Sequence, residues 1–321
     1  MNMHSMAPAT VGVVGATGYT GMELLRILRV HGGVQVRFAT SEGHAGEPSG
    51  IPGVDLVGSA DAPLGEADIV FLCLPHGKSV GWARRALEAG ARVIDLTADH
   101  RPGSGRDAGA VYGMADLLAD CIAPARLVAN PGCYPTGVQL ALHPLQRAGL
   151  LDTSRPVVVN AASGVTGAGR SPKRDLLFAE VAGDFRAYAT GNQHRHLLEM
   201  RASLPSLQLL FQPHLLPVPR GILETLYVPV RAGVDAQAIR SLWQATYADA
   251  STIRIVADAP RLSDVVGTDL LQLAAVDNAG TEPPLVTVLA CFDNLGKGAA
   301  GQAVHNMNLM LGQEATRGLR C

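Results

Sequence analysis

The sequence has little lysine, no close pair of cysteines, and no apolar run long enough to cross a membrane. Of its 26 basic residues only three are lysine, a bias that we interpret as genomic base composition. The net charge of −2 gives no electrostatic reason to bind nucleic acid or an anionic membrane. A membrane helix needs about 18 to 20 consecutive apolar residues, and no stretch reaches that length. We therefore expect neither nucleic acid nor a membrane as a partner.

The five cysteines are odd in number and widely spaced, at positions 73, 121, 133, 291 and 321. Without a Cys-x-x-Cys pair they predict neither a disulfide framework nor a structural zinc site. The first ten residues, MNMHSMAPAT, contain neither the charged nor the apolar region of a signal peptide. We therefore expect a protein of the reducing cytoplasm with no bound metal. The absence of any Tyr-x-x-x-Lys pair argues against a short-chain dehydrogenase.

The chain has 321 residues, of which 47% are hydrophobic and 17% charged, so it is globular and long enough for about two domains. Its first part alternates apolar strands with helices. The expected strands are 10–16, 34–40, 67–75 and 92–97, and the expected helices are 21–31 and 79–90. Such alternation predicts a parallel sheet covered on both faces.

After residue 133 the pattern changes to strands joined by long loops. We expect strands at 156–163, 221–231, 251–257, 271–278 and 284–293, with one clear helix at 235–248. Residues 298–312 form a further helix, apolar on one face, which could return to the first domain. The predicted fold is α/β: a Rossmann-type parallel-sheet domain (1–133 and about 300–321) plus an α+β catalytic and oligomerisation domain (134–299).

A glycine-rich turn lies between the first strand and the first helix. Gly15, Gly18 and Gly21 have the spacing G-x-x-G-x-x-G, which departs from the usual G-x-G-x-x-G. A plain strand–helix turn is the simpler interpretation. The position near the N-terminus favours a dinucleotide site, where glycines allow close approach of a pyrophosphate to the helix N-terminus.

The second strand ends in Thr40, Ser41 and Glu42, where a dinucleotide site reads the adenosine ribose. The two hydroxyls suit a 2′-phosphate, whereas the carboxylate suits the 2′-hydroxyl of NAD. The signal is mixed at this position.

Cys133 follows a strand-like segment and begins a helix-like run that is interrupted at Pro144. A thiol at a helix N-terminus is favoured as a thiolate, although most unpaired cysteines are buried small hydrophobes. A nucleophile of this kind needs a proton-transfer partner. His194, His196 and Glu199 supply candidates, although they could also be a solvated helix start. The glycine-rich loop 163–174 could wrap a nicotinamide or a substrate, or be only a flexible connection. Two arginines in polar turns, Arg101 and Arg220, could bind a phosphate or a carboxylate, although most arginines are simply solvated.

Seven motifs occur in order along almost the whole chain: GATGYTG, LPHG, DLTADHR, NPGCYPTG, SGVTGAGR, HRHLLE and DNLGKGAAGQAVHNMN. Through these seven motifs the chain resembles the N-acetyl-γ-glutamyl-phosphate reductases of arginine biosynthesis. Aspartate-semialdehyde dehydrogenase belongs to the same wider group.

The resemblance implies that Cys133 forms an acyl thioester, with His194 and Glu199 as its catalytic partners and NADP(H) as cofactor. It implies a substrate site containing Arg101, Asn130, Arg170, His196 and Arg220. A homodimer or homotetramer is implied as well. The implied cofactor site contains Gly15, Thr17, Gly18, Tyr19, Thr20, Gly21, Thr40, Ser41, Ser163, Gly164, Gly167 and Asn294.

Two positions depart from the family pattern: Glu42 replaces an arginine, and His100 replaces a phenylalanine. The first bears on the choice between NADP and NAD, and the second on the pocket wall. Two alternatives stay open. One is a reductase of a related acyl phosphate, of aminoadipyl or aspartyl type. The other is a non-catalytic dinucleotide-sensing regulator, which would not need Cys133, His194 and Glu199 together.

Overall fold

The computed structural model describes residues 8–106 and 109–321, so most of the segment considered for a signal peptide lies outside the described residues. The described chain divides into two compact units. The first comprises 1–101, 106–130 and 303–319, and the second comprises 102–105, 131–302 and 320–321. We describe each unit separately. The predicted domain limits at 133 and about 300 stay a prediction.

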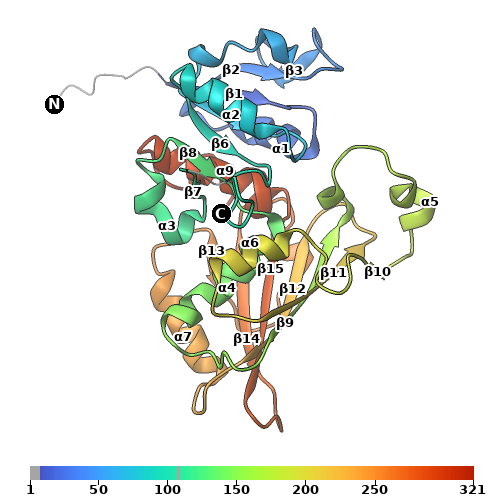
Figure 1. Ribbon diagram of the computed structural model, residues 1–321, viewed down its shortest axis with the longest axis vertical. Helices are drawn as coiled ribbons and strands as arrows, with labels where there is room; N and C mark the ends of the chain where they lie inside the picture. Colours follow the sequence, from blue (N-terminus) through green and yellow to red (C-terminus); the bar gives the residue numbers. More distant parts are fainter. Residues whose placement is uncertain (1–7, 107–108) are drawn as a thin grey trace, which may run out of the picture. The chain divides into compact units, whose positions relative to one another are not determined.

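The first unit contains an eight-stranded sheet of order β3-β4-β2-β1-β5-β6-β8-β7 (Figure 1). All its pairings are parallel except that between β3 and β4. The strands are β1 (Ala9–Val14), β2 (Val34–Thr40), β3 (Pro48–Ile51), β4 (Val54–Val57), β5 (Ile69–Leu72), β6 (Arg92–Asp95), β7 (Val111–Tyr112) and β8 (Leu127–Ala129). The predicted parallel sheet is confirmed.

Helices of this unit follow the strands in the order expected of a Rossmann-type fold. They are α1 (Tyr19–Leu28), α2 (Ser79–Glu88) and α3 (Ala115–Ile122). Strand β5 is buried at every position, as near-continuous apolar strands of a covered parallel sheet should be. The core beside α2 is apolar and includes Val14, Phe38, Val70, Leu72 and Val93.

The second unit is built on a seven-stranded mixed sheet of order β10-β11-β9-β12-β15-β14-β13. Its strands are β9 (Val157–Gly164), β10 (Arg186–Ala187), β11 (Leu209–Leu216), β12 (Ile222–Pro229), β13 (Ile253–Ile255), β14 (Leu271–Asp277) and β15 (Leu285–Phe292). The five predicted strands are present. β11, which contains Pro213, was missed, and it pairs in parallel with β9 over its whole length.

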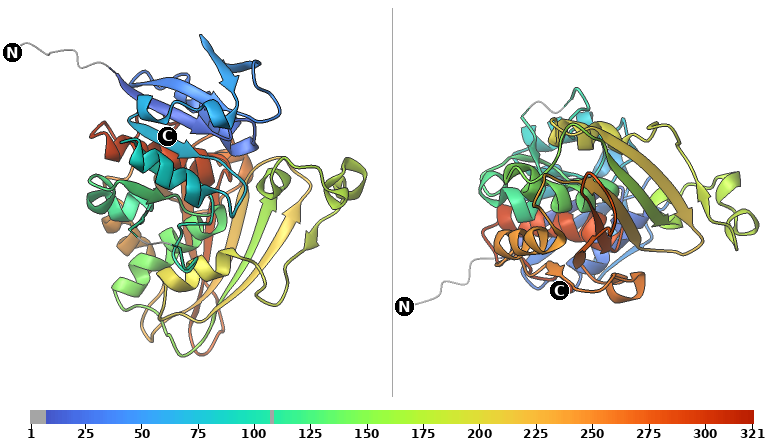
Figure 2. Two further views of the ribbon diagram at one scale, coloured as in Figure 1. Left: turned by 45° about the horizontal axis from the view of Figure 1, so that its top comes forward. Right: turned by 90° about the horizontal axis from the view of Figure 1, so that it is seen from below.

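Helices α4 (Cys133–Arg147), α6 (His196–Ser203) and α7 (Ala236–Thr246) lie on one face of this sheet (Figure 1). The short helices α5 (Phe178–Val181) and α8 (Leu262–Val265) complete the unit. Figure 2 shows α5 in an arm that extends away from the edge of the sheet at β10.

Helix α4 continues through Pro144, so the interruption expected from the sequence is wrong. A proline inside a helix has no N–H for the carbonyl four residues earlier. That carbonyl belongs to Leu140, and the buried Tyr247 hydroxyl donates to it at 2.6 Å. A side chain from another element thus replaces the missing helical donor.

The last helix, α9 (Gly301–Met310), follows a π-helical turn over Gly296–Ala300. Residues 303–319 belong to the first unit, so the chain does return to it. The residues of the predicted apolar face, Ala303, Val304, Met307 and Met310, are buried, and the polar residues of the other face are buried as well. Among the polar residues, Asn306 Nδ2 donates to Gly113 O at 2.9 Å and to Asn130 Oδ1 at 3.0 Å.

Candidate active site

The predicted site residues fall into two groups, one in each unit. The first unit holds residues 15–21, 40, 41, 101 and 130, and the second holds the remainder. Within residues 8–106 and 109–321, no three His, Cys, Asp or Glu side chains are arranged to hold a metal ion. In the same part of the chain, no cysteine is in a disulfide and no helix is long and apolar enough to span a membrane.

The glycine-rich turn of the first unit joins β1 to α1, and each of its three glycines has a different surrounding. Gly15 has a φ of 85°, and a Cβ there would lie 2.5 Å from Cys73 O. A Cβ at Gly21 would lie 2.6 Å from Gly15 O, so this glycine lets the helix pack on the turn. A Cβ at Gly18 would meet nothing nearer than 3.9 Å.

Gly18 is also the N-cap of α1, and no side chain caps the helix there. The first N–H groups of a helix need acceptors, and together with the helix dipole they favour an anion. The open space at Gly18 and the uncapped helix start therefore fit the pyrophosphate of a dinucleotide. Thr17 lies in the same turn, and Tyr19 and Thr20 are the first two residues of α1.

The end of β2 supports this turn. Thr40 is fully buried, and its hydroxyl accepts a hydrogen bond from Gly15 N–H at 3.1 Å. The hydroxyls of Ser41 and Thr17 lie 2.9 Å apart, and Glu42 is exposed. Thr40 thus underlies the turn, whereas Ser41 lies beside it.

Two basic residues in or near β2 are candidates to balance the negative charge of a 2′-phosphate. Each of them contacts a carboxylate instead. Arg37 Nε lies 2.6 Å from Glu66 Oε2, and His44 Nδ1 lies 3.1 Å from Glu47 Oε1.

Arg101 is buried at the carboxyl end of the parallel sheet. Its Nε donates to Asn130 O at 2.8 Å and its Nη2 to Leu96 O at 2.9 Å. The guanidinium therefore ties together the segments that follow β6 and β8. His100, which replaces the family's phenylalanine, is buried with its Nδ1 2.5 Å from Asp95 Oδ2.

Cys133 is the first residue of α4 and is partly buried. The N-cap residue Gly132 has extended backbone angles and, as a glycine, supplies no capping side chain. Gly132 N–H donates to Glu199 Oε1 at 2.9 Å, so a buried carboxylate from α6 holds the turn that precedes the cysteine. A helix start of this kind favours a thiolate, and that Cys133 is ionised there stays a prediction.

His194 lies in an aromatic cage beside this helix start. Its ring centroid is 5.5 Å from that of Tyr134, 5.7 Å from Tyr188, 5.5 Å from Phe211 and 4.8 Å from His196. Burial, with a smaller contribution from the Arg195 charge, lowers the pKa of His194 from 6.5 to about 4. His194 is therefore a neutral imidazole at pH 7.

The neutral ring has a defined orientation. The backbone N–H of His196 donates to His194 Nδ1 at 3.2 Å, which leaves the proton of the neutral imidazole on Nε2. His194 is thus presented as a hydrogen-bond donor through Nε2. His196 is itself buried, with its ring 5.9 Å from that of Tyr134.

Two tyrosines that the sequence did not single out complete this cluster. The hydroxyls of Tyr134 and Tyr188 lie 3.0 Å apart. Burial is the main cause that raises the pKa of both, to about 12 for Tyr188. Both hydroxyls therefore keep their protons at neutral pH. Tyr134 follows Cys133 directly, which was the only signal available, and no local feature marks Tyr188.

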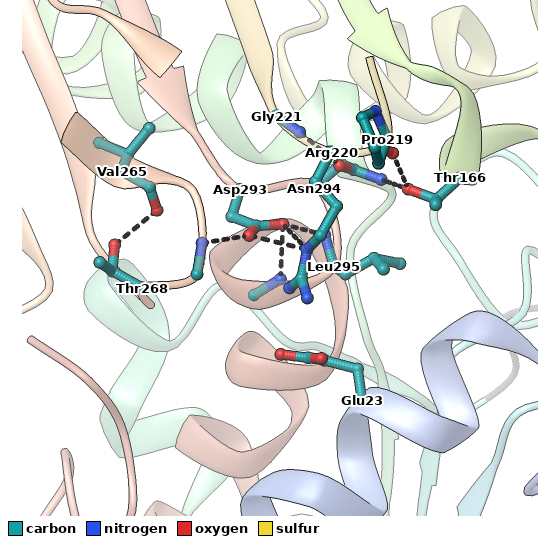
Figure 3. A network of polar contacts seen from close by, with 12 residues as sticks. Glu23, Thr166, Pro219, Arg220, Gly221, Val265, Thr268, Asp293, Asn294 and Leu295 are labelled. Carbon is teal, nitrogen blue, oxygen red and sulfur yellow. Dashed lines mark hydrogen bonds and ion pairs between the residues drawn. The ribbon is translucent and has the colours of Figure 1, made fainter. Parts of the chain in front are cut away.

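The remaining predicted residues surround the loop after β9. Asn294 connects two segments: its Oδ1 accepts from Gly221 N–H at 2.8 Å, and its Nδ2 donates to Thr166 Oγ1 at 2.9 Å (Figure 3). Arg220 Nε donates to the buried carboxylate of Asp293 at 3.1 Å (Figure 3). Asn294 and Arg220 are thus built into one polar network that holds this loop.

Around that loop, Ser163 is buried and its hydroxyl donates to Gly164 O at 3.1 Å. A Cβ at Gly164 would lie 2.7 Å from Arg220 N, so the loop start packs tightly against the segment before β12. Gly167 and Arg170 are exposed.

Known proteins match the chain along nearly its whole length. Residues 10–125 match the semialdehyde dehydrogenase NAD binding domain, and residues 133–294 match the semialdehyde dehydrogenase dimerisation domain. The N-acetyl-gamma-glutamyl-phosphate reductase of Rhodopirellula baltica is 40% identical over 96% of this chain and 97% of its own. That of Acidothermus cellulolyticus is 41% identical over 97% of each. The chain belongs to the N-acetyl-gamma-glutamyl-phosphate reductase family.

Solved structures share the fold at lower identity. Aspartate semialdehyde dehydrogenase II of Vibrio cholerae, complexed with ASA, has a TM-score of 0.81 at 22% identity, over 96% of this chain and 99% of that one. The Candida albicans aspartate semialdehyde dehydrogenase with NADP has a TM-score of 0.74 at 15% identity, over 95% and 99%. The two-part fold predicted from the sequence is confirmed.

Proposed function

We propose that this chain reduces N-acetyl-L-glutamyl 5-phosphate to N-acetyl-L-glutamate 5-semialdehyde and phosphate, with NADPH as the reductant. Membership in the reductase family supports the substrate and the arginine-biosynthetic role. The match to an NAD binding domain supports the cofactor class. The observation that carries the chemistry is Cys133 at the uncapped start of α4, beside a neutral histidine donor.

Cys133 is the proposed nucleophile. Its thiolate adds to the acyl carbon, the bond to the phosphate oxygen breaks, and phosphate leaves with the bonding pair. A thioester on Cys133 results. When bound, NADPH supplies the hydride that reduces the thioester carbon. His194 Nε2–H would donate a hydrogen bond to the carbonyl oxygen as it becomes negative. That oxygen then re-forms its double bond to carbon as the C–S bond breaks, which gives the aldehyde and the thiolate.

Glu199 acts in this proposal by holding Gly132 and hence the sulfur. His196, Arg101, Asn130, Arg170 and Arg220 are proposed substrate-site residues. The cofactor residues are those of the glycine-rich turn and β2, together with Ser163, Gly164, Gly167 and Asn294. The uncapped start of α1 and the open space at Gly18 support the part of this assignment that concerns the pyrophosphate. We place the reaction in the cytoplasm.

The reverse reaction provides the test. Purified protein should reduce NADP with N-acetylglutamate 5-semialdehyde only when inorganic phosphate is present. Cys133→Ser should abolish turnover with cofactor affinity nearly unchanged, because a hydroxyl is far less acidic than a thiol. Faster turnover with the aminoadipate or aspartate semialdehyde would favour the related reductases. Cofactor binding without any turnover would favour a sensing protein.

The assembly is proposed to be a homodimer or homotetramer, because residues 133–294 match a dimerisation domain. Sedimentation equilibrium at micromolar concentration distinguishes these states. A monomer at that concentration would contradict the proposal.

A further inference from the structure

Glu224 is a carboxylic acid at a core position of β12. Side chains of this strand alternate, and the neighbouring inward positions, Ile222, Leu226 and Val228, are apolar and fully buried. Glu224 has the same orientation and is likewise fully buried. The proposed mechanism uses no group at this position.

The carboxyl group of Glu224 lies against α4, one turn after Cys133. A Cβ on Gly137 would lie 2.2 Å from Glu224 Oε2 and 2.6 Å from the Phe292 ring. Gly137 thus leaves the space that the carboxyl group fills. A Cβ built on Gly298 would lie 3.2 Å from the same Phe292 ring and 3.2 Å from Cys133 Cβ. One aromatic ring therefore lies close to both the carboxyl group and the cysteine.

Neither carboxyl oxygen of Glu224 has a hydrogen-bond partner among the described residues. Its cross-strand neighbours are Ala161 of β9 and Ala290 of β15. An ionised carboxylate without a partner is very costly in such a place, so the group is held uncharged. Burial accordingly raises the pKa of Glu224 well above its ordinary value.

Helix α4 and strand β15, which pack around Glu224, carry two titratable thiols besides Tyr134, His143 and Arg147 of α4. Cys133 begins α4, and Cys291 lies on β15 beside Ala290. Burial is the main cause that raises the pKa of Cys291 to about 12. Cys291 therefore stays a neutral thiol, and Cys133 is the group on which ionisation of Glu224 would act.

We propose that Glu224 limits the pH range over which Cys133 is reactive, because its carboxyl group beneath α4 must stay uncharged for the Cys133 thiolate to form. The proposal rests on the nucleophilic role given to Cys133 above. Four helical residues span about 6 Å. A full negative charge at about that distance, in an effective dielectric of about 20, would lower the thiolate population about 100-fold.

The test compares wild type with Glu224→Gln, which keeps the shape of the side chain but cannot ionise. Glu180→Gln, at an exposed position of α5, is the matched control. Alkylation of Cys133 by iodoacetamide is followed by mass spectrometry from pH 6 to 9.5, with the exposed Cys121 as internal reference. We expect wild type and Glu224→Gln to coincide near neutral pH. Above the pH at which Glu224 ionises in the fold, wild-type alkylation should fall behind by up to about 100-fold.

Unfolding equilibria provide the second measurement. A carboxyl whose pKa is raised in the fold destabilises the protein as pH rises above its unfolded value, near 4.5. The unfolding constant of wild type relative to Glu224→Gln should therefore increase about tenfold per pH unit from about pH 5 upward. A flat ratio would show that Glu224 is charged in the fold and would overturn the proposal.

The pH at which that ratio stops rising marks the ionisation of Glu224 in the fold. Coincident alkylation profiles above that pH would also overturn the proposal, because Glu224 would then only fill the core. Neither measurement requires substrate. A failure of the nucleophile assignment, seen as full turnover by Cys133→Ser, and a failure of the reductase assignment, seen as no turnover by wild type, are thus both distinguishable from a failure of this inference.

Discussion

Protonation of His194 should govern much of the acid sensitivity of the folded protein. Its pKa is lowered to about 4 in the fold, against 6.5 in the unfolded chain. Between these values the unfolded chain binds a proton that the folded protein does not bind. The free energy of unfolding therefore has its full value above about pH 6.5 and falls as pH decreases toward 4.

The size of the effect follows from the shift. Each pKa unit corresponds to about 1.4 kcal/mol, so a lowering from 6.5 to about 4 sets an upper limit of about 3.5 kcal/mol. His194→Asn removes the titrating group. We expect the stability of this variant to fall less steeply with acid than that of wild type, by about 1 kcal/mol per pH unit between pH 6 and 5.

Urea denaturation at several pH values from 7.5 to 5 measures this difference directly. Gln193→Asn, at the exposed preceding position, controls for a change in the same loop that removes no titrating group. Other histidines whose pKa values are lowered, His31 and His143, are present in every variant and cancel in the comparison. Parallel curves for wild type and His194→Asn would show that the aromatic cage does not exclude the imidazolium, and the reasoning would fail.

Two further predictions concern the ligands of the proposed reaction. Arg101→Leu should lower stability by about 1 to 3 kcal/mol, because it removes the donors to Asn130 O and Leu96 O. If Arg101 also binds the leaving group, the KM for phosphate in the oxidative direction should rise. An unchanged KM in the folded variant would leave Arg101 only a structural role. Wild type should have a higher kcat/KM for NADP than for NAD. Glu42→Arg should sharpen that preference, because it replaces an exposed carboxylate near Ser41 with a cation. A wild-type preference for NAD would contradict the cofactor assignment.

Strands were predictable where the pattern of burial is local. β2 and β15 have the expected limits to within a residue or two, because their apolar residues run or alternate as a sheet requires. β11 was missed because Pro213 cannot donate to a ladder and argues against a central strand. In the structure, Pro213 uses its acceptor instead, receiving the Tyr188 N–H at 3.1 Å.

The site was predictable only as far as motifs extend. Cys133 could be singled out because a thiol between a turn and a helix start has a physical meaning that can be read from neighbouring residues. The environment of His194 could not, because Tyr188 and Phe211 reach it from different elements, far from Cys133 in the sequence. Glu224 likewise looks like an ordinary polar position of a strand until its burial against Gly137 is known.

Helix α4 combines both lessons and gives a final prediction. Pro144 offers no N–H to Leu140 O, and the Tyr247 hydroxyl supplies the donor at 2.6 Å. Tyr247→Phe should therefore leave a buried carbonyl without this donor and lower stability by about 1 to 3 kcal/mol. The control is Tyr227→Phe, at an exposed tyrosine, which should change the free energy of unfolding by no more than about 0.5 kcal/mol.

Pro144→Ala restores the missing N–H, so the same Tyr247→Phe change should destabilise the protein less in that background. A double-mutant cycle by urea denaturation measures the difference, and we expect a coupling free energy of about 1 kcal/mol. If the two changes are additive, the hydroxyl does not substitute for the helical donor. The continuity of α4 through Pro144, and with it the support of the Cys133 helix, would then need another physical cause.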